Sequence, residues 1–276
     1  MMKILPRPVI TLTTDFGLKD HYVAAIKGVI LKLCPNAQIV DVSHTINRHD
    51  VREAAYVLAQ ASPYFPEDTV HVVVVDPGVG TERRRLAIRG RRGYFVGPDN
   101  GVLMPAARRE GIVRMVEVVN REMMLPSVSS TFEGRDVFAP VAAHLANGVD
   151  IVKLGPEVNE PVELPWGDFE ATPLRVTGEV LHIDGFGNII TNIPNSAIEP
   201  WRQGSFLRAK VGPREESSIL SRSYADVPEG RTVVVLGSAS FLEIAVNRGS
   251  AEELFAAQVG SRVKLEKAIG DDTRRR

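Results

Sequence analysis

Residues 70–75 read valine at every position except His71, and they end in Asp76-Pro77-Gly78. A strand that is apolar on both faces is typical of the centre of a parallel sheet, because helices then cover both faces. This run therefore constrains the chain to an α/β architecture in which Asp76 follows a central strand.

Strand-like and helix-like segments alternate around this run. Residues 9–14 are rich in β-branched side chains, and residues 21–33 place apolar side chains at helical spacing. A second pair follows, with a strand expected at residues 38–42 and an alanine-rich helix at residues 50–61 that Asp50 would cap. We expect a largely parallel sheet, extended by a hairpin and a short helix. The hairpin is expected at residues 85–96 and the helix at residues 140–147.

The pattern changes in the last part of the chain. Residues 158–173 are rich in Pro and Glu and lack periodicity, which indicates a linker. Beyond them, short strands alternate with Gly and Pro turns, as in a small β-barrel. Strands are expected at residues 174–183, 187–193, 206–211, 232–236 and 262–265. The sequence thus predicts an N-terminal α/β domain over residues 1–165 and a smaller C-terminal β-barrel domain over residues 173–270.

Charge and hydropathy exclude several classes of partner. The 33 Lys and Arg nearly balance the 34 Asp and Glu, and a formal net charge of -1 disfavours nucleic acid and anionic membranes as partners. No apolar run approaches the roughly 18 residues of a membrane span, and residues 1–7 lack the apolar stretch of a secretory signal. A cytoplasmic location is expected. The six histidines show no metal-ligand spacing, so no metal site is expected.

Three aspartates stand at or near the ends of expected parallel strands: Asp15, Asp41 and Asp76. Ligands bind off the carboxyl ends of strands in open α/β sheets, so we expect two or more of these carboxylates to face one crevice. Each could instead serve only as a turn or cap residue, since Asp-Phe-Gly and Asp-Pro-Gly are common turn formers.

The glycine-rich loop that follows Asp76 does not match a phosphate-binding motif. Residues 78–83 lack the Gly-Lys-Ser/Thr ending of a Walker loop and the third glycine of a dinucleotide fingerprint. The loop instead carries Asp76 and Arg83 at its two ends, where it could fold the guanidinium toward the carboxylate.

Further segments combine polar side chains with glycine. Residues 130–136 place two carboxylates and an arginine around Gly134, and their composition alone indicates a loop in which Asp136 caps the following helix. Residues 183–188 indicate a tight turn between strands, whereas residues 223–226 and 237–247 indicate strand ends and loops.

In their order and residue sequence, seven segments across nearly the whole chain resemble one family. This family is the adenosine-forming S-adenosylmethionine hydrolases, relatives of the fluorinase and the chlorinase. The segments are TDFG at 14–17, DVSH at 41–44, VVDPGVGTERR at 74–84, GPDNG at 97–101, TFEGRDVFAP at 131–140, IDGFGNIITNI at 183–193 and FLEIAVNRG at 241–249. The resemblance implies an N-terminal α/β domain, a C-terminal β-barrel domain and a homotrimer. In that trimer the ligand would lie between one subunit's N-terminal domain and its neighbour's C-terminal domain.

The resemblance also implies how the substrate, S-adenosyl-L-methionine, is held. The carboxylate of Asp15 would accept hydrogen bonds from both ribose hydroxyls, which suits an ionised acid. Phe186 and Tyr224 would stack around the adenine, and Asn188 and the backbone near Val246 would hydrogen-bond to it. The candidates for the methionine moiety are Asp20, Asp184, Ser238 and Glu243.

The implied reaction is displacement at ribose C5′ by water, which gives adenosine and L-methionine. The sulfonium leaves as a neutral thioether, so only the water must be oriented and deprotonated, and no cofactor is implied. The resemblance suggests an Asp-Arg-His set, of which Asp76 and Arg83 match the first two members. The commoner motif reads Phe-His-Gly-Arg-Asp, whereas this chain has Glu133 in place of the histidine. Either Glu133 orders or deprotonates the water as a second carboxylate, or Asp76 and Arg83 suffice.

Two other functions are compatible with much of the same pattern. A 5′-halogenase is disfavoured because halogenating relatives carry a tyrosine where this chain has Asp76, whose charge would repel a halide. The fluorinase's long insertion before its counterpart of GPDNG is also missing. A protein that binds adenosine or S-adenosylmethionine without catalysis stays open. Ala239 stands where the fluorinase has an arginine near the methionine carboxylate, so recognition of that end is expected to differ.

Overall fold

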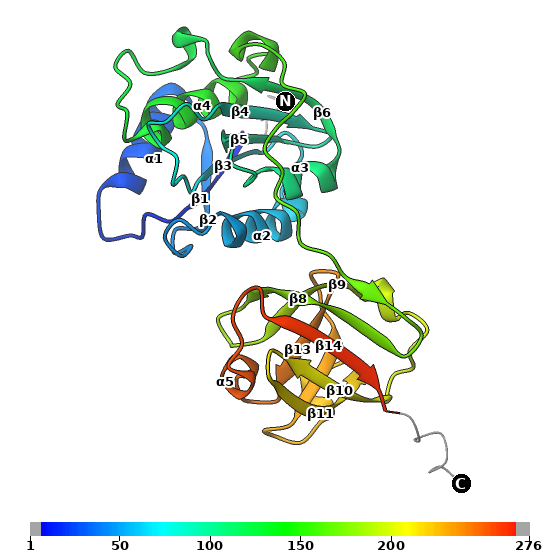
Figure 1. The fold of residues 1–276 in the computed structure, drawn as a ribbon. Coiled ribbons are helices and arrows are strands. Elements are labelled where there is room, and N and C mark those ends of the chain that lie inside the picture. Colours follow the sequence, from blue (N-terminus) through cyan, green and yellow to red (C-terminus); the bar gives the residue numbers. More distant parts are fainter. Residues whose placement is uncertain (1–6, 269–276) are drawn as a thin grey trace, which may run out of the picture. The chain divides into compact units, whose positions relative to one another are not determined.

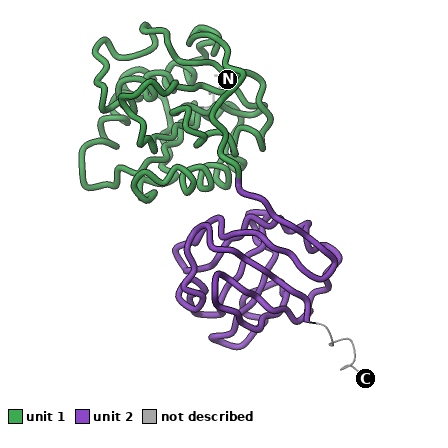
Figure 2. Tube along the Cα trace, viewed as in Figure 1, with its two compact units in different colours: residues 1–165 green, residues 166–276 purple. Residues whose placement is uncertain are grey.

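The computed structural model of the chain describes residues 7–268 (Figure 1). The chain divides into two compact units, residues 1–165 and residues 166–276 (Figure 2). Within residues 7–268, no helix combines the length and the apolar character needed to cross a bilayer.

The first unit is built on a six-stranded, largely parallel sheet, as the sequence predicts. Strands β2, β1, β3 and β5 run parallel in that order, and β4 and β6 extend the sheet with antiparallel pairings. The strands, in sheet order, are β2 (Gln38–Ser43), β1 (Val9–Thr14), β3 (Val70–Val74), β5 (Tyr94–Pro98), β4 (Arg85–Gly90) and β6 (Ile112–Glu117). The hairpin expected at residues 85–96 is β4 and β5, whereas β6 was not expected.

Helices cover both faces of this sheet (Figure 1). Helix α1 (Tyr22–Leu33) packs against α4 (Ala139–Ala146), and α2 (Val51–Ala61) packs against α3 (Met104–Glu110). The side chain of Asp50 accepts a hydrogen bond from the backbone N–H of Glu53 at 2.9 Å, which confirms the predicted cap of α2. Short helical turns complete the unit at Ser62–Tyr64, Arg121–Met123 and Ile151–Leu154, with a π-helix at Gly134–Phe138.

The core of the first unit follows from strand alternation. Ile10 and Leu12 of β1 lie on one side of the sheet with Val72 of β3, and Ile26 and Ile30 of α1 pack against them. Successive residues of a strand face opposite sides of the sheet, so the residues between Ile10, Leu12 and their neighbours on this side belong to the other layer. This two-sided burial holds the ends of β1 and β3 in fixed positions.

His71, the exception in the valine run, is buried as a neutral side chain. Its Nδ1 lies 2.8 Å from Thr11 Oγ1, its ring stacks on Phe95, and burial lowers its pKa to about 4. In the unfolded chain the imidazole of His71 takes up a proton below about pH 6.5, whereas in the folded protein it does so only near about pH 4. The free energy of unfolding should therefore fall by up to about 3 kcal/mol as the pH drops through this window.

A His71→Asn variant tests this expectation, since the amide keeps a polar atom near Thr11 but does not titrate. Urea unfolding is measured from about pH 7 to about pH 4, a range that includes the roughly 6.5 reference pKa of histidine. The free energy of unfolding should depend less on pH in the variant than in the parent. Parallel curves for the two proteins would contradict the assignment.

The second unit is a closed barrel of seven strands with a short additional strand at one edge. Strand β14 closes the barrel by pairing with both β10 and β8, and β11 pairs parallel to β12. Its strands are β7 (Glu170–Ala171), β8 (Arg175–Ile183), β9 (Ile189–Pro194), β10 (Phe206–Val211), β11 (Arg214–Ser221), β12 (Thr232–Leu236), β13 (Phe241–Val246) and β14 (Arg262–Lys267). The predicted barrel is thus confirmed, although β11 and β13 were not among the expected strands. A short helix, α5 (Ala251–Phe255), packs beside β13.

Candidate active site

Asp15 and Asp76 follow neighbouring strands at the same edge of the sheet. Thr14 of β1 is in register with Val74 of β3, so the residues that follow both strands emerge side by side. Asp15 Oδ2 accepts a hydrogen bond from the backbone N–H of His49 at 2.9 Å. Gly17 completes the turn after Asp15 with a φ of 68°, a conformation that favours glycine.

Asp41, the third aspartate of the predicted crevice, lies elsewhere. It is inside β2, in register with Leu12, and its Oδ2 accepts a hydrogen bond from Lys27 at 2.6 Å. Burial would raise the pKa of Asp41, but interactions with Lys27 and His44 outweigh it and hold that pKa below its usual value. The imidazole of His44 also lies 2.8 Å from Thr14 Oγ1. Asp15 and Asp76 thus emerge together at one edge of the sheet, whereas Asp41 contacts Lys27 and His44, and His44 in turn contacts Thr14 at the end of β1.

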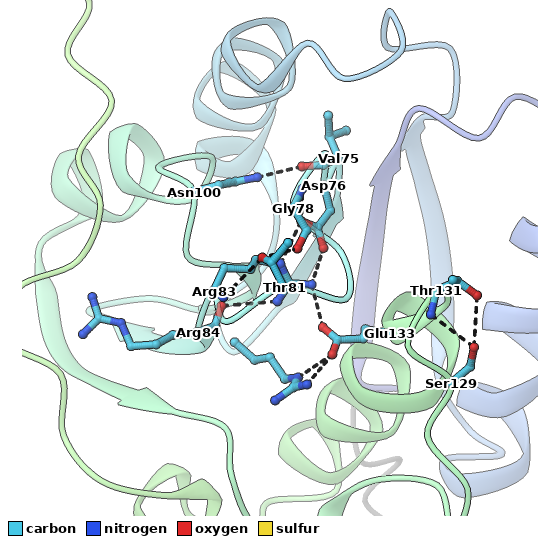
Figure 3. A network of polar contacts seen from close by, with 11 residues as sticks. Val75, Asp76, Gly78, Thr81, Arg83, Arg84, Asn100, Ser129, Thr131 and Glu133 are labelled. Carbon is cyan, nitrogen blue, oxygen red and sulfur yellow. Dashed lines mark hydrogen bonds and ion pairs between the residues drawn. The ribbon is translucent and has the colours of Figure 1, made fainter.

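The loop after β3 folds Arg83 back onto Asp76, as Figure 3 shows. Arg83 Nε donates to Asp76 Oδ1 at 2.8 Å, and Arg83 Nη2 donates to Asp76 Oδ2. The backbone N–H of Gly78 also donates to Asp76 Oδ1, at 3.2 Å. Only 5% of the Asp76 side chain and 10% of the Arg83 side chain are exposed. The predicted approach of the guanidinium to the carboxylate across this loop is confirmed.

Glu133 joins the pair through the same guanidinium. Arg83 Nη2 donates to Glu133 Oε2 at 2.5 Å, and Arg85 Nε donates to Glu133 Oε1 at 2.8 Å. Burial alone would lower the pKa of Arg83, but hydrogen bonds and charge attraction from Asp76 and Glu133 outweigh it and raise that pKa. The structure therefore brings together two buried carboxylates, Arg83 between them and a second arginine behind Glu133.

Local packing fixes the position of Glu133. It stands directly before the π-helix Gly134–Phe138, a geometry often found at functional sites. A Cβ on Gly134 would lie 3.1 Å from Val74 Cγ1, so a larger residue here would require the Val74 side chain to shift by a few tenths of an ångström. Asp136 lies inside the π-helix, where its Oδ2 accepts a hydrogen bond from the backbone N–H of Ser129 at 2.8 Å. The predicted role of Asp136 as a helix cap is wrong, because the π-helix begins before it.

These carboxylates border a cavity of about 290 Å³ in the first unit. That volume is near the lower end of the range for small-molecule sites. Asp15, Asp20, Asp76 and Glu133 all line it, as do the rings of Phe16, Tyr22 and Phe132. The site residues predicted in the N-terminal domain therefore share one cavity, with Arg83 directly behind its wall.

The GPDNG segment supports this wall. Asn100 Nδ2 donates to the backbone oxygen of Val75 at 3.0 Å (Figure 3), which holds the residue directly before Asp76. Asp99 is buried and accepts a hydrogen bond from Arg84 Nε at 2.7 Å. Asn100 thus helps to position the loop that carries Asp76, whereas Asp99 binds Arg84 and does not line the cavity.

The remaining predicted residues lie in the second unit, and three of them, Asp184, Phe186 and Asn188, form the turn between β8 and β9. Asp184 Oδ1 accepts hydrogen bonds from the backbone N–H groups of Phe186 and Asn188, and its Oδ2 accepts from Asn188 Nδ2, all at 2.9 Å. Asp184 thus fixes both the turn and the amide of Asn188. The Phe186 residue is 83% exposed, so its ring is available for stacking.

Tyr224 and Glu243 form a second pair in the same unit. The Tyr224 hydroxyl donates to Glu243 Oε1, and burial followed by this contact raises the pKa of Tyr224. Burial raises the pKa of Glu243 as well, against the opposing effect of the Tyr224 hydrogen bond, and the charge of Asp184 adds to the rise. Val246 ends β13, whereas Ser238 is exposed in the turn between β12 and β13.

Sequence reasoning missed Arg85, Arg48 and His49. Arg48 and His49 line the cavity, and His49 also donates to Asp15. The spacing of Arg83 and Arg85 could have revealed Arg85, since alternate residues of an extended chain point the same way. Within the part of the chain that the structure describes, no three His, Cys, Asp or Glu side chains gather as a metal site.

Comparison with known proteins identifies the family of this chain. The family model for the SAM hydroxide adenosyltransferase N-terminal domain matches residues 10–155, and that for the C-terminal domain matches residues 178–264. A protein of Salinispora tropica named (R)-S-adenosyl-L-methionine hydrolase is 42% identical over 264 residues, covering 94% of this chain and 98% of its own. A protein of the same name from Thermus thermophilus is 44% identical over 271 residues, covering 94% and 99%.

The structural comparison agrees with the sequence comparison. A crystal structure of an uncharacterized conserved protein from Thermotoga maritima superposes with a TM-score of 0.89 at 38% identity, covering 94% of this chain and 100% of that one. Proteins named fluorinase also match, at a lower identity of 28–30%. The chain belongs to the SAM hydroxide adenosyltransferase family.

Proposed function

We propose that this protein hydrolyses S-adenosyl-L-methionine to adenosine and L-methionine by attack of water at ribose C5′. The observation that carries the proposal is the buried Asp76 carboxylate, which lines the cavity and accepts hydrogen bonds from Arg83. The names of the relatives at 42–44% identity support the same activity.

Asp76 is the proposed base for the attacking water. A carboxylate can accept a proton from water that is held in hydrogen-bond reach, and the reaction needs no acid on the leaving side because a thioether departs. The bidentate contact with Arg83 fixes the orientation of Asp76, which would let the carboxylate orient the attacking water. A site that is closed to bulk solvent strengthens each of these electrostatic contacts.

The cavity also suits the charge of the substrate. Four carboxylates line it; Arg83 and Arg85 balance Asp76 and Glu133, which leaves Asp15 and Asp20 against one lining arginine, Arg48. A sulfonium cation is favoured beside such a wall, and its positive charge disappears as the carbon–sulfur bond breaks. Asp15 is the proposed partner of the ribose hydroxyls, because an ionised carboxylate accepts hydrogen bonds from both.

The proposal extends to the second unit and to assembly. Phe186, Asn188 and Tyr224 are proposed to hold the adenine, with Val246 contributing backbone, and their exposed rings and fixed amide support this. Asp20, Asp184, Ser238 and Glu243 stay candidates for the methionine moiety. A homotrimer with active sites between subunits, a cytoplasmic location and the absence of any cofactor besides the substrate also stay predictions.

An isotope experiment tests the activity. The purified protein is incubated with S-adenosyl-L-methionine in ¹⁸O-labelled water, with and without chloride, and the products are separated and weighed by mass spectrometry. We expect adenosine that carries ¹⁸O at the 5′ position, together with methionine. A 5′-chloro nucleoside would favour the halogenase instead, and binding without any product would favour a non-catalytic binding protein.

A further inference from the structure

The buried charges around Glu133 form a balanced set of two carboxylates and two guanidinium groups. Asp76 and Glu133 are acidic, and Arg83 and Arg85 are basic. The Glu133 side chain is only 4% exposed, whereas that of Arg85 is 31% exposed, and Arg85 is not among the residues that line the cavity. Burying a carboxylate is costly unless a cation and hydrogen bonds accompany it, so the two guanidinium partners of Glu133 offset the cost of burying its charge.

The two oxygens of Glu133 have different partners. Oε2 accepts from Arg83 Nη2, the same nitrogen that donates to Asp76 Oδ2. Oε1 accepts from Arg85, through Nε at 2.8 Å and through Nη2. Arg83 is therefore shared between two carboxylates, and Arg85 serves Glu133 in a bidentate contact to one oxygen. Without Arg85, both carboxylates would depend on a single guanidinium.

We propose that Arg85 is a positioning residue, which neutralises Glu133 so that Arg83 stays bidentate on Asp76 and Asp76 stays ionised as the base. The inference rests on the hydrolase function proposed above. In this inference Glu133 and Arg85 act as a pair. Each residue compensates the charge of the other.

The balance of charge predicts how the pH dependence of kcat/KM should shift in variants of this pair. Removing the charge of Arg85 leaves the set with a net negative charge, so it takes up a proton at higher pH. Removing the charge of Glu133 leaves the set with a net positive charge. The set then takes up a proton only at lower pH, and its positive charge repels the sulfonium cation. The other titratable groups that line the cavity are Asp15, Asp20, Tyr22, Arg48 and His49, and they are the same in every variant.

The test is a set of pH profiles of kcat/KM for the parent, Arg85→Gln, Glu133→Gln and the double variant. For Arg85→Gln the acid limb should move up by about one pH unit, and for Glu133→Gln it should move down, with a higher KM. In the double variant the net charge is restored, so the limb should return to its parental position and kcat/KM should exceed that of Arg85→Gln.

Two further variants separate positioning from simple loss of structure. Arg85→Lys keeps the charge and should keep the acid limb within a few tenths of a pH unit of the parental position, even where kcat/KM falls because the bidentate contact is lost. Arg89→Gln is the matched control, because Arg89 lies on the same strand and pairs with the exposed Asp68. Its profile should equal that of the parent.

The outcomes distinguish the two proposals. A parent protein that makes no adenosine overturns the hydrolase and this inference together. A parent that hydrolyses, combined with an acid limb that moves in neither single variant or stays displaced in the double variant, overturns only the inference. Thermal melting of each variant confirms folding. If Arg85→Gln does not fold, the Arg85→Lys and double variants still test charge matching: parental acid limbs in both support it, and a displaced limb in either overturns it.

Discussion

Replacing Asp76 with Asn should lower kcat by about 10²- to 10⁴-fold, the range over which general bases contribute to enzymatic rates. Asn keeps the shape of the side chain but cannot accept the proton of the attacking water. It also turns an NH₂ group or a neutral oxygen toward Arg83, whose Nε now meets a carboxylate oxygen at 2.8 Å. We expect KM to change much less than kcat, because the loss affects mainly the transition state.

Steady-state rates of adenosine formation, with thermal melting of the same samples, measure this effect. The matched control is Asp99→Asn, since Asp99 is also buried and also accepts from an arginine, at 2.7 Å from Arg84 Nε. Asp99 is not among the cavity-lining residues, so its variant should lose stability and keep most of its kcat. If both variants lose kcat equally, the effect of Asp76 is structural and its assignment as base is wrong.

The parts of the fold that follow from local pattern could be predicted. The buried strand at Val70–Val74 and the β-branched strand at Val9–Thr14 match their expected bounds to within a residue. The capped helix α2 was equally clear, because Asp50 satisfies a backbone N–H that the helix itself leaves free. Such signals depend on residues close together in the chain, which a single sequence displays directly.

The missed strands lack such signals. The first four residues of β11 are polar and exposed, and the strand is held by its register with β10, where Lys210 faces Glu215. Strand β13 is apolar at nearly every position and follows a Gly-Ser-Ala-Ser turn, so turn residues dominate the pattern around it. Cross-strand pairing decided both strands, since β11 pairs with β10 and β12, and β13 pairs with β12 and β9.

Part of the candidate site could likewise be predicted from the sequence, and part could not. The register of β1 and β3 brings Asp15 and Asp76 together, which the rule for strand ends anticipates. That rule fails for Asp41, because β2 runs past it and Lys27 of α1 binds its carboxylate. The contact between Arg85 and Glu133 joins residues 48 positions apart, and only the fold shows it.

Replacing Asp15 with Asn should lower kcat/KM by about 10- to 100-fold, mainly through a higher KM. Hydrogen bonds to a charged group contribute about 1.5 to 3 kcal/mol, and about 1.4 kcal/mol corresponds to a factor of ten. The backbone N–H of His49 already occupies Asp15 Oδ2 at 2.9 Å, so the amide oxygen of Asn would remain with His49. Its NH₂ group would then face the ribose hydroxyls, where an acceptor is needed.

A substrate series makes this prediction specific to the ribose. With 2′-deoxy S-adenosylmethionine the parent protein should already lose part of this binding energy, so Asp15→Asn should cost less with the deoxy substrate than with the natural one. Asp41→Asn is the control, because its carboxylate is bound to Lys27 and does not line the cavity. Equal losses of kcat/KM for Asp15→Asn with both substrates would show that Asp15 acts only through the turn it shares with His49. Unequal losses would support a contact between the carboxylate and the 2′-hydroxyl, which would place the ribose at the carboxyl end of β1, in the cavity that Asp76 also lines.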